Sequence, residues 1–294
     1  MGIALPRLLT YAILILAVPL LILLATRGPT DGNGDAAVGR WVQTANTDWC
    51  ERNYAVTPYV AEFGNSLSSL SIIMNGVYGI YWHWGSVETR YMICFVCFIF
   101  VGAGSCLFHG TLMREWQLAD ELPMVWSNGV FVYCILTAED KEGKKRPEYA
   151  ALISIITVIM TFAIIFFDTE DQMLFLLCYG GGVVYILFGS RSLDTKFNST
   201  NEVILLETSI LSYVGGFCFW LVDRLFCNEI IAGLHIRSMH LHSFWHLGAG
   251  IGTFSMVLFW IWCRNAYLKR TQILLGSIPG MQFVSVENGA SKLV

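Results

Sequence analysis

Histidine, serine and aspartate side chains occur in this sequence at spacings that suit metal chemistry. Ser105 and His109 lie four residues apart, which places both on one face of a helix. Far downstream, His242 and His246 repeat this spacing and present two ring nitrogens to one point. Three imidazoles are the ligand set of a catalytic zinc ion whose fourth position stays open for water. The pattern predicts a zinc site at His109, His242 and His246.

Neighbouring polar residues predict the rest of a hydrolytic site. Zinc lowers the pKa of a bound water, and Asp120 is the candidate carboxylate to take or orient its proton. Ser105 is the candidate hydroxyl donor to the oxyanion of a tetrahedral intermediate. Asp223 is the candidate to orient one of the histidines from behind. The alternative is three unrelated histidines near a membrane interface.

A second polar cluster precedes the first long apolar segment. Closely spaced carboxylates and an amide suit a hard cation with oxygen ligands, such as calcium, and here they are Asp48, Glu51, Asn53 and Glu62. The spacing differs from that of an EF-hand loop, and the alternative is a solvated acidic turn. Cys50 and Cys227 fall on the same predicted side of the membrane, where an oxidising lumen would allow a disulfide between them.

The elements that must position these residues are membrane helices. Apolar residues make up 55% of the chain and charged residues 14%, whereas a soluble globule carries charge on about one quarter of its residues. Apolar runs of about 20 residues between short polar loops predict an all-α membrane protein with a seven-transmembrane-helix bundle and an intramembrane zinc site. The predicted spans are 59–82, 91–111, 122–138, 148–167, 172–189, 203–222 and 241–263. Ionisable groups within such spans face the bundle interior and mark a functional site.

The remaining segments complete the predicted domain organisation. Residues 1–27 combine Arg7 with an apolar run, which is typical of a signal peptide or of a signal anchor that adds a transmembrane helix. Residues 28–58 form a polar lumenal segment that contains the calcium cluster. Residues 59–263 form the seven-helix domain, and residues 264–294 form a polar, loose cytoplasmic tail.

The distribution of basic residues predicts the orientation. Positive charge gathers in the loops on one side, which makes that side cytoplasmic; the residues are Arg90, Lys141, Lys144, Lys145, Arg146, Arg191, Lys196, Arg264, Lys269 and Arg270. The metal sites then lie towards the lumenal or extracellular side. His83 falls on the cytoplasmic side and is expected in the aromatic belt, while His235 and His240 are expected in a loop. A basic patch interleaved with aromatic residues is missing from the sequence, so no nucleic acid is expected as a partner.

The chain resembles the alkaline ceramidase family over roughly residues 46–265. The resemblance rests on D-W-C-E-R-N-Y from Asp48, A-E-F-G-N-S from Ala61, G-S-C-L-F-H-G-T-L from Gly104, Q-L-A-D-E-L-P-M from Gln117 and H-S-F-W-H from His242. It is closest to the type acting on phytoceramides and unsaturated long-chain ceramides. The departure from the family is the N-terminal extension.

The resemblance implies a seven-helix intramembrane zinc amidase related to the adiponectin-receptor-like hydrolases. It implies zinc on His109, His242 and His246, with Ser105 and Asp120 in catalysis. It implies a disulfide between Cys50 and Cys227 and a stimulatory calcium ion, whose ligands would be Asp48, Trp49 through its backbone carbonyl, Glu51, Asn53 and Glu62.

The expected reaction is hydrolysis of the amide of ceramide, a lipid drawn from the bilayer, to a sphingoid base and a fatty acid. The expected compartment is the endoplasmic reticulum or Golgi, with the cell surface as the alternative, and no obligate protein partner is indicated. The alternative function is a seven-helix zinc-containing receptor of the adiponectin-receptor-like type. A transporter has less support because neither broken helices nor internal repeats are evident.

Overall fold

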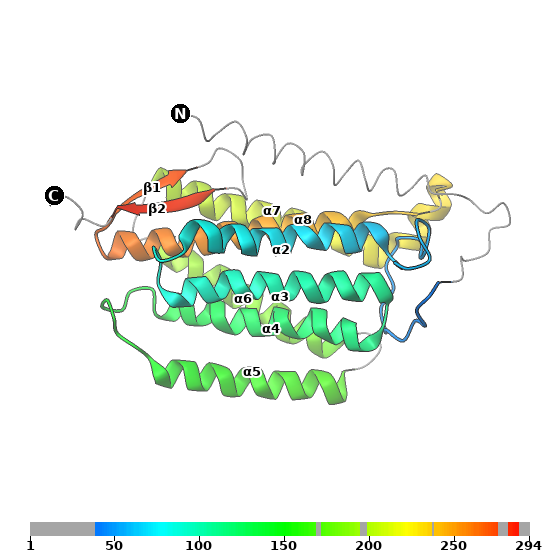
Figure 1. Cartoon of the computed structure of the whole chain (residues 1–294), viewed down its shortest axis with the longest axis horizontal. Helices are drawn as coiled ribbons and strands as arrows, with labels where there is room; N and C mark the ends of the chain where they lie inside the picture. The colour runs from blue at the N-terminus through cyan, green and yellow to red at the C-terminus, as the bar shows by residue number, and fades with distance from the viewer. Residues whose placement is uncertain (1–38, 169–171, 195–198, 237, 276–281, 288–294) are drawn as a thin grey trace.

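The computed structural model describes residues 39–168, 172–194, 199–236, 238–275 and 282–287. The apolar run predicted within residues 1–27 lies outside this part of the chain. The described residues form seven helices and one two-stranded sheet, labelled as in Figure 1. The elements are α2 (Phe63–His83), α3 (Thr89–Thr111), α4 (Arg114–Leu136), α5 (Pro147–Phe167), α6 (Met173–Asp194), α7 (Thr200–Leu234), α8 (Leu241–Tyr267), β1 (Thr271–Leu275) and β2 (Phe283–Glu287).

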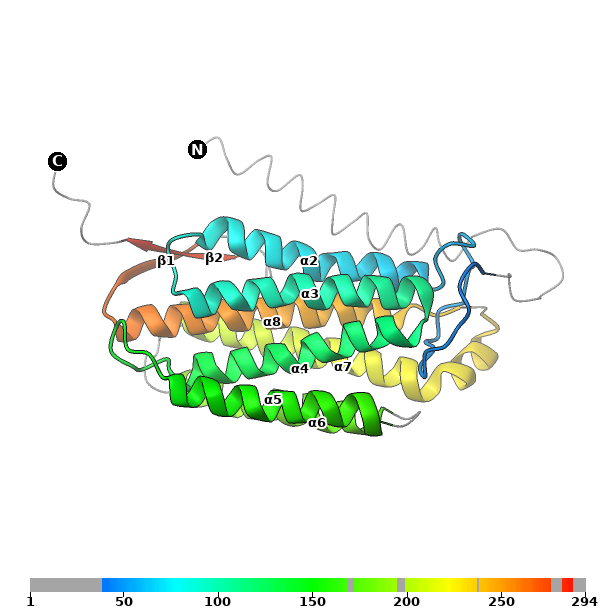
Figure 2. The same cartoon turned by 60° about the horizontal axis from the view of Figure 1, so that its bottom comes forward.

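The helices run side by side along one axis, so the molecule has two distinct ends (Figures 1 and 2). We call one end the histidine end: it holds residues 39–62, the α3–α4 turn and the α7–α8 connection. We call the other the hairpin end: it holds β1 and β2, the α2–α3 turn and the α4–α5 loop. Short links force successive helices to alternate in direction, which brings the end of α3 and the start of α8 to the same depth.

Helices α8 and α5 occupy opposite environments. In the most apolar window of α8, 67% of the residues are buried inside the protein, against 6% in α5. Helix α8 therefore packs among the other helices, while α5 lies at the edge of the bundle (Figure 1). Several isoleucine and phenylalanine side chains of α5 are exposed. An apolar outer face suits contact with lipid acyl chains.

The seven predicted helices are confirmed, but only five of them are long and apolar enough to span a membrane by length and composition: α3, α5, α6, α7 and α8. The expectation of seven such spans is therefore not fully matched. Helices α2 and α4 contain too many polar residues, and these are buried: Asn65, Ser68 and Ser69 in α2, and Gln117 and Glu121 in α4. The polar faces of α2 and α4 are thus turned into the protein, which lowers their hydropathy without exposing them.

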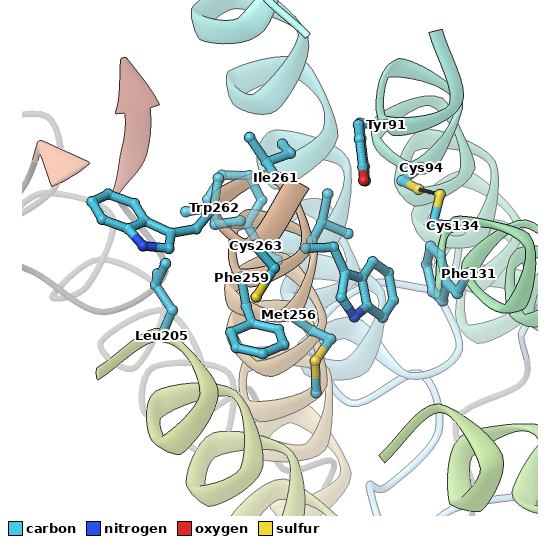
Figure 3. Close-up of a cluster of buried hydrophobic side chains, with 14 of the residues drawn as sticks. Tyr91, Cys94, Phe131, Cys134, Leu205, Met256, Phe259, Ile261, Trp262 and Cys263 are labelled. Carbon is cyan, nitrogen blue, oxygen red and sulfur yellow. Dashed lines mark hydrogen bonds between the residues drawn. The ribbon is translucent and has the colours of Figure 1, made fainter. Parts of the chain in front are cut away.

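A large apolar cluster holds the helices together towards the hairpin end. Figure 3 shows Met256 and Phe259 of α8 between Leu205 of α7 and Phe131 of α4. Phe259 is fully buried, as are most residues of this part of α8. Burying a side chain of this size contributes about 1.5–3 kcal/mol. This cluster fixes α8 against its neighbours and so sets where its histidine-bearing first turns lie.

The C-terminal segment is more ordered than the predicted loose tail. Strand β1 pairs antiparallel with β2, and Phe283 stacks on Trp82 with ring centroids 4.2 Å apart. The Val284 amide donates to His83 Nε2 at 3.3 Å, and His83 Nδ1 lies 2.8 Å from the Gly79 carbonyl oxygen. His83 is fully buried by these contacts, so its predicted place in an interfacial aromatic belt is wrong. The sequence placed it correctly at a helix end but could not show that the distant hairpin covers it.

Candidate metal centre

Three histidine side chains meet at the histidine end of the bundle. His109 comes from the last turn of α3, and His242 and His246 come from the first two turns of α8. One ring nitrogen from each lies within 4.8 Å of the other two, and all three residues are buried. The structure thus brings together the three residues that the spacing predicted as ligands.

Hydrogen bonds fix the orientation of two of these rings. His109 Nδ1 lies 2.5 Å from Glu62 Oε2, and His246 Nδ1 lies 2.7 Å from Ser68 Oγ. Occupied Nδ1 atoms leave Nε2 of each ring free for another partner. Within the described part of the chain, His109 Nε2 is buried and has no hydrogen-bond partner. Metal-bound histidines typically bind the metal through one ring nitrogen and hold a carboxylate with the other. His109 fits this arrangement, with Nδ1 at Glu62 and Nε2 unpaired among the described residues.

The third ring is held by packing instead of by a side-chain hydrogen bond. The Trp49 indole stacks on the His242 imidazole, with centroids 3.6 Å apart and planes at 22°. Among the described residues, His242 Nδ1 is buried and without a partner. Three buried imidazoles, two of which have an unpaired nitrogen among the described residues, fit a metal ion of the zinc class, for which neutral imidazole is a preferred ligand.

Ser105 and Asp120 lie beside the histidines, as the sequence predicted. Ser105 Oγ is 2.9 Å from Ser69 Oγ and 3.5 Å from His246 Nε2, and its hydroxyl also interacts with the Asp120 carboxylate. Their helices meet closely at Gly104, where an added Cβ would lie 1.9 Å from the Ala119 carbonyl oxygen. A glycine is therefore required next to Ser105 for α3 and α4 to approach in this way.

The five residues assigned to calcium gather where residues 39–62 meet the start of α2. Asn53 Nδ2 donates to both carboxylate oxygens of Asp48, at 3.1 and 3.0 Å, and Asn53 Oδ1 is buried with no partner in the described structure. Glu62 Oε1 accepts from the Trp49 amide at 2.9 Å. The free amide oxygen beside a carboxylate fits a hard cation.

Glu51 and Glu62 have roles that the sequence did not reveal. Glu51 accepts hydrogen bonds from the Gly64 and Asn65 amides, at 2.6 and 2.8 Å, and so caps the N-terminus of α2. Glu62 holds His109 with one oxygen and the Trp49 amide with the other. Glu62 therefore connects the residues predicted to bind calcium directly to His109, one of the three histidines.

Asp223 supports the site through the main chain. Its carboxylate accepts from the His242 amide at 3.2 Å and from the Cys50 amide at 3.0 Å. Asp223 thus holds the main chain of the first turn of α8. The sequence instead predicted that this carboxylate orients a histidine ring. Close by, Cys50 and Cys227 form a disulfide, which follows a kink of α7 at Phe226 (φ −125°, ψ 17°). Helix α7 continues beyond the predicted end of its span at residue 222, and the kink divides it into two helical segments.

Other histidines stay outside the cluster. His235 ends α7 with a positive φ of 52°, and His240 precedes α8 with its Nδ1 3.6 Å from Glu51 Oε2. The expectation that both lie in the loop is confirmed.

Sequence reasoning missed the serine-rich stretch of α2 that supports the site. Ser68 binds His246, Ser69 binds Ser105, and Ser243 Oγ donates to Asn65 Oδ1 at 2.8 Å. The signal was present in N-S-L-S-S-L-S from Asn65, because hydroxyls repeated at helical spacing within an apolar segment need polar partners.

A cavity of about 540 Å³ extends from this centre between α3, α4, α6, α7 and α8. His242, His246, Ser105 and Asp120 line its polar part, and aliphatic and aromatic side chains line most of the remainder. Such a cavity suits a largely apolar ligand with one polar group held at the histidines.

Residues 42–277 match the sequence model of the Ceramidase family. The chain is 31% identical to alkaline ceramidase 3 of Mus musculus over 259 residues, which cover 83% of this chain and 95% of that protein. It is 27% identical to the alkaline ceramidase YPC1 of Saccharomyces cerevisiae, covering 75% and 77% of the two chains. It is 25% identical to the alkaline ceramidase of Arabidopsis thaliana, covering 83% and 93%.

Proposed function

Because the chain belongs to the alkaline ceramidase family, we propose that this amidohydrolase cleaves the amide bond of ceramides by a zinc-dependent reaction that calcium stimulates. The products would be a sphingoid base and a free fatty acid. The observation that carries the zinc proposal is the buried group formed by His109, His242 and His246, in which His109 Nε2 and His242 Nδ1 have no hydrogen-bond partner among the described residues.

The ligands of the proposed zinc ion would be His109, His242 and His246. When bound, zinc would supply Lewis acidity for the amide carbonyl and an activated water as nucleophile. The Glu62 carboxylate would hold His109 through its Nδ1, and the Ser68 hydroxyl would hold His246 through its Nδ1. Nε2 of each ring would then be directed at the metal.

Ser105 and Asp120 would handle the oxyanion and the proton. The Ser105 hydroxyl lies beside His246 Nε2, where it would donate a hydrogen bond to the negative charge that develops on the amide oxygen. Asp120 would accept the proton of the attacking water and return it to the leaving nitrogen. The apolar wall of the cavity would hold the hydrocarbon chains of the lipid and exclude water.

We propose calcium at Asp48, Glu51, Asn53, Glu62 and the Trp49 backbone carbonyl. Support comes from the unpaired Asn53 Oδ1 and from the two-sided role of Glu62. A cation at this position would act on turnover by ordering the residues that hold His109 and His242.

The orientation that we propose places the histidine end in the lumen and the hairpin end in the cytoplasm. Most lysine and arginine residues of the short loops lie at the hairpin end, which favours the cytoplasm. A disulfide at the histidine end suits an oxidising compartment, and we propose the endoplasmic reticulum or Golgi.

The test is metal content together with ceramide turnover, measured on the purified wild-type protein and on His242→Ala. We expect about one zinc ion per wild-type chain, and loss of zinc and turnover together in the variant. Zinc without turnover of any ceramide would contradict the hydrolase and favour the zinc-containing receptor. Turnover by wild-type protein that binds no zinc would contradict the metal assignment.

A further inference from the structure

A second carboxylate lies on the cavity wall, one residue after Asp120. Glu121 is 3% exposed, and its Oε1 accepts hydrogen bonds from Gln117 Nε2 at 2.7 Å and from Gln172 Nε2. Its other oxygen, Oε2, is buried and has no partner among the described residues. The mechanism above does not use this oxygen.

The residue that holds Glu121 is itself held in an unusual conformation. Gln172 directly precedes α6 and has φ 55°, a left-handed value that is uncommon for residues other than glycine. Its side chain is buried and bridges two helices, donating to Glu121 of α4 and accepting from Arg224 Nη1 of α7 at 3.0 Å. Backbone strain of this kind persists where the surrounding structure fixes it, and it concentrates at ligand sites.

Several other polar groups on the cavity wall have hydrogen-bond partners within the protein. Ser127 Oγ donates to the Pro123 carbonyl at 2.6 Å, and Asn128 Nδ2 donates to the Tyr179 carbonyl at 2.9 Å. The hydroxyls of Tyr179 and Tyr213 pair with each other at 2.6 Å. Glu121 Oε2 differs from these groups because it is a strong acceptor that lacks any donor.

We propose that Glu121 Oε2 accepts a hydrogen bond from a hydroxyl group of the sphingoid head of ceramide. This inference rests on the proposed function. Ceramide carries one hydroxyl on each carbon next to the amide-bearing carbon, so placing the amide at Ser105 and Asp120 brings both hydroxyls to the polar end of the cavity. A buried acceptor costs free energy when it is unpaired. A substrate whose hydroxyl pairs with the acceptor therefore binds more tightly than a substrate that lacks this hydroxyl. Gln172 and Arg224 are positioning residues that hold the carboxylate for this contact.

The test compares three substrates: ceramide, 1-deoxyceramide and 3-deoxyceramide. With the wild-type protein, kcat/KM should fall about 10- to 100-fold for the analogue that lacks the recognised hydroxyl, mainly through KM. Whichever analogue is the poor substrate identifies the hydroxyl. In Glu121→Gln the new amide oxygen can still accept hydrogen bonds from Gln117 and Gln172. The new amide NH2 group then takes the position of Oε2, so a hydrogen-bond donor replaces the acceptor there. The ratio of kcat/KM for ceramide to kcat/KM for the poor analogue should then fall to within about threefold, with zinc content unchanged.

The matched control is Glu115→Gln, on the exposed first turn of the same helix, which should keep the wild-type preference. Gln172→Asn tests the same contact if Glu121→Gln does not accumulate, because asparagine tolerates a positive φ but its shorter side chain leaves Glu121 less firmly held. It should reduce the preference partly.

The failures of the two proposals are distinguishable. Equal kcat/KM for all three substrates in the wild type, or an unchanged preference in Glu121→Gln, would overturn the role of Glu121 alone. Failure of the zinc-loaded wild type to cleave any ceramide would overturn the proposed function, and the inference with it.

Discussion

The two ends of the bundle both bury histidine, but they treat its ring nitrogens differently. At the hairpin end, His83 has both nitrogens engaged, one at the Gly79 carbonyl and one at the Val284 amide. At the histidine end, His109 and His242 each keep one buried nitrogen without a partner within the described residues. Burial of an unpaired polar atom is costly, so the two ends differ in whether the protein alone satisfies the nitrogens of its buried histidines.

The cysteines also differ between the two ends, and a buried arginine at the hairpin end has its partners within the protein. At the hairpin end, Cys94 and Cys134 are free thiols with their sulfur atoms 3.6 Å apart, as Figure 3 shows, whereas Cys50 and Cys227 are joined at the histidine end. Arg264 is buried at the hairpin end, and it donates to Glu88 Oε1 at 2.8 Å and to the Ala138 carbonyl at 3.0 Å. Arg264 is thus satisfied within the protein, whereas the unpaired nitrogens of His109 and His242 fit a ligand.

The largest expected effect separates the two kinds of buried histidine. His109→Gln removes a metal ligand worth several kcal/mol in the transition state, so turnover should fall by about a thousandfold or more. His83→Gln should leave turnover per folded molecule within about threefold and lower the free energy of unfolding by about 1–3 kcal/mol, because a buried hydrogen bond is lost. Turnover assays and thermal unfolding of the purified proteins check both. A comparable loss of turnover in both variants would contradict the conclusion that only the histidines of the histidine end take part in the reaction.

A second prediction compares two carboxylates, the buried Glu62 at the histidine end and the half-buried Glu88 at the hairpin end. Glu62→Gln removes the charge that holds His109 Nδ1, so zinc affinity or turnover should drop about 10- to 100-fold. Glu88→Gln removes the partner of Arg264 at the other end and should change stability but not zinc content. Metal titration by competition with a chelator measures the first effect. Equal zinc affinity in wild type and Glu62→Gln would refute the coupling of Glu62 to the metal.

A third prediction concerns the cysteines. Cys227→Ser opens a disulfide that spans a sequence separation of 177 residues and should cost about 2–5 kcal/mol of stability. Cys134→Ser should cost less, because it replaces one small buried side chain that makes only weak sulfur contacts. Thermal unfolding with and without reductant ranks the two. A reductant that leaves the wild-type midpoint unchanged would argue against a stabilising disulfide.

The smallest expected effect lies in the exposed α4–α5 loop of the hairpin end. Hydrogen bonds from Arg146 Nε and Nη2, at 2.8 and 2.7 Å, lower the pKa of Asp140 below its usual value. The stabilisation is therefore complete above the unfolded pKa of about 3.9 and is lost as the pH falls through the lower folded pKa. Asp140→Asn should remove this small acid dependence without affecting turnover. Unfolding midpoints between neutral and acid pH measure it, and identical curves for both proteins would show that the pair contributes nothing.

The sequence by itself determined the parts that depend on local order along the chain. Helix number followed from runs of apolar residues. The members of the three-histidine cluster followed from spacing, because residues four apart on a helix share a face wherever the helix lies. Two pairs could be placed together from the sequence once the side of the membrane at which each helix end lies was predicted. These pairs are His242 with His246 and Ser105 with His109. Cys50 and Cys227 were paired by the side of the membrane on which they fall.

Only the tertiary structure decided the contacts between helices, because these depend on how each helix is rotated and shifted against its neighbours. Such contacts include Glu62 on His109, Trp49 on His242 and the chain from Glu121 through Gln172 to Arg224. The same limit explains the misplaced His83, which the hairpin covers from 201 residues away along the chain. It also explains why α2 and α4 fall short of the hydropathy of a typical span: their polar faces find partners inside the bundle, and hydropathy along the chain cannot show which way a face turns.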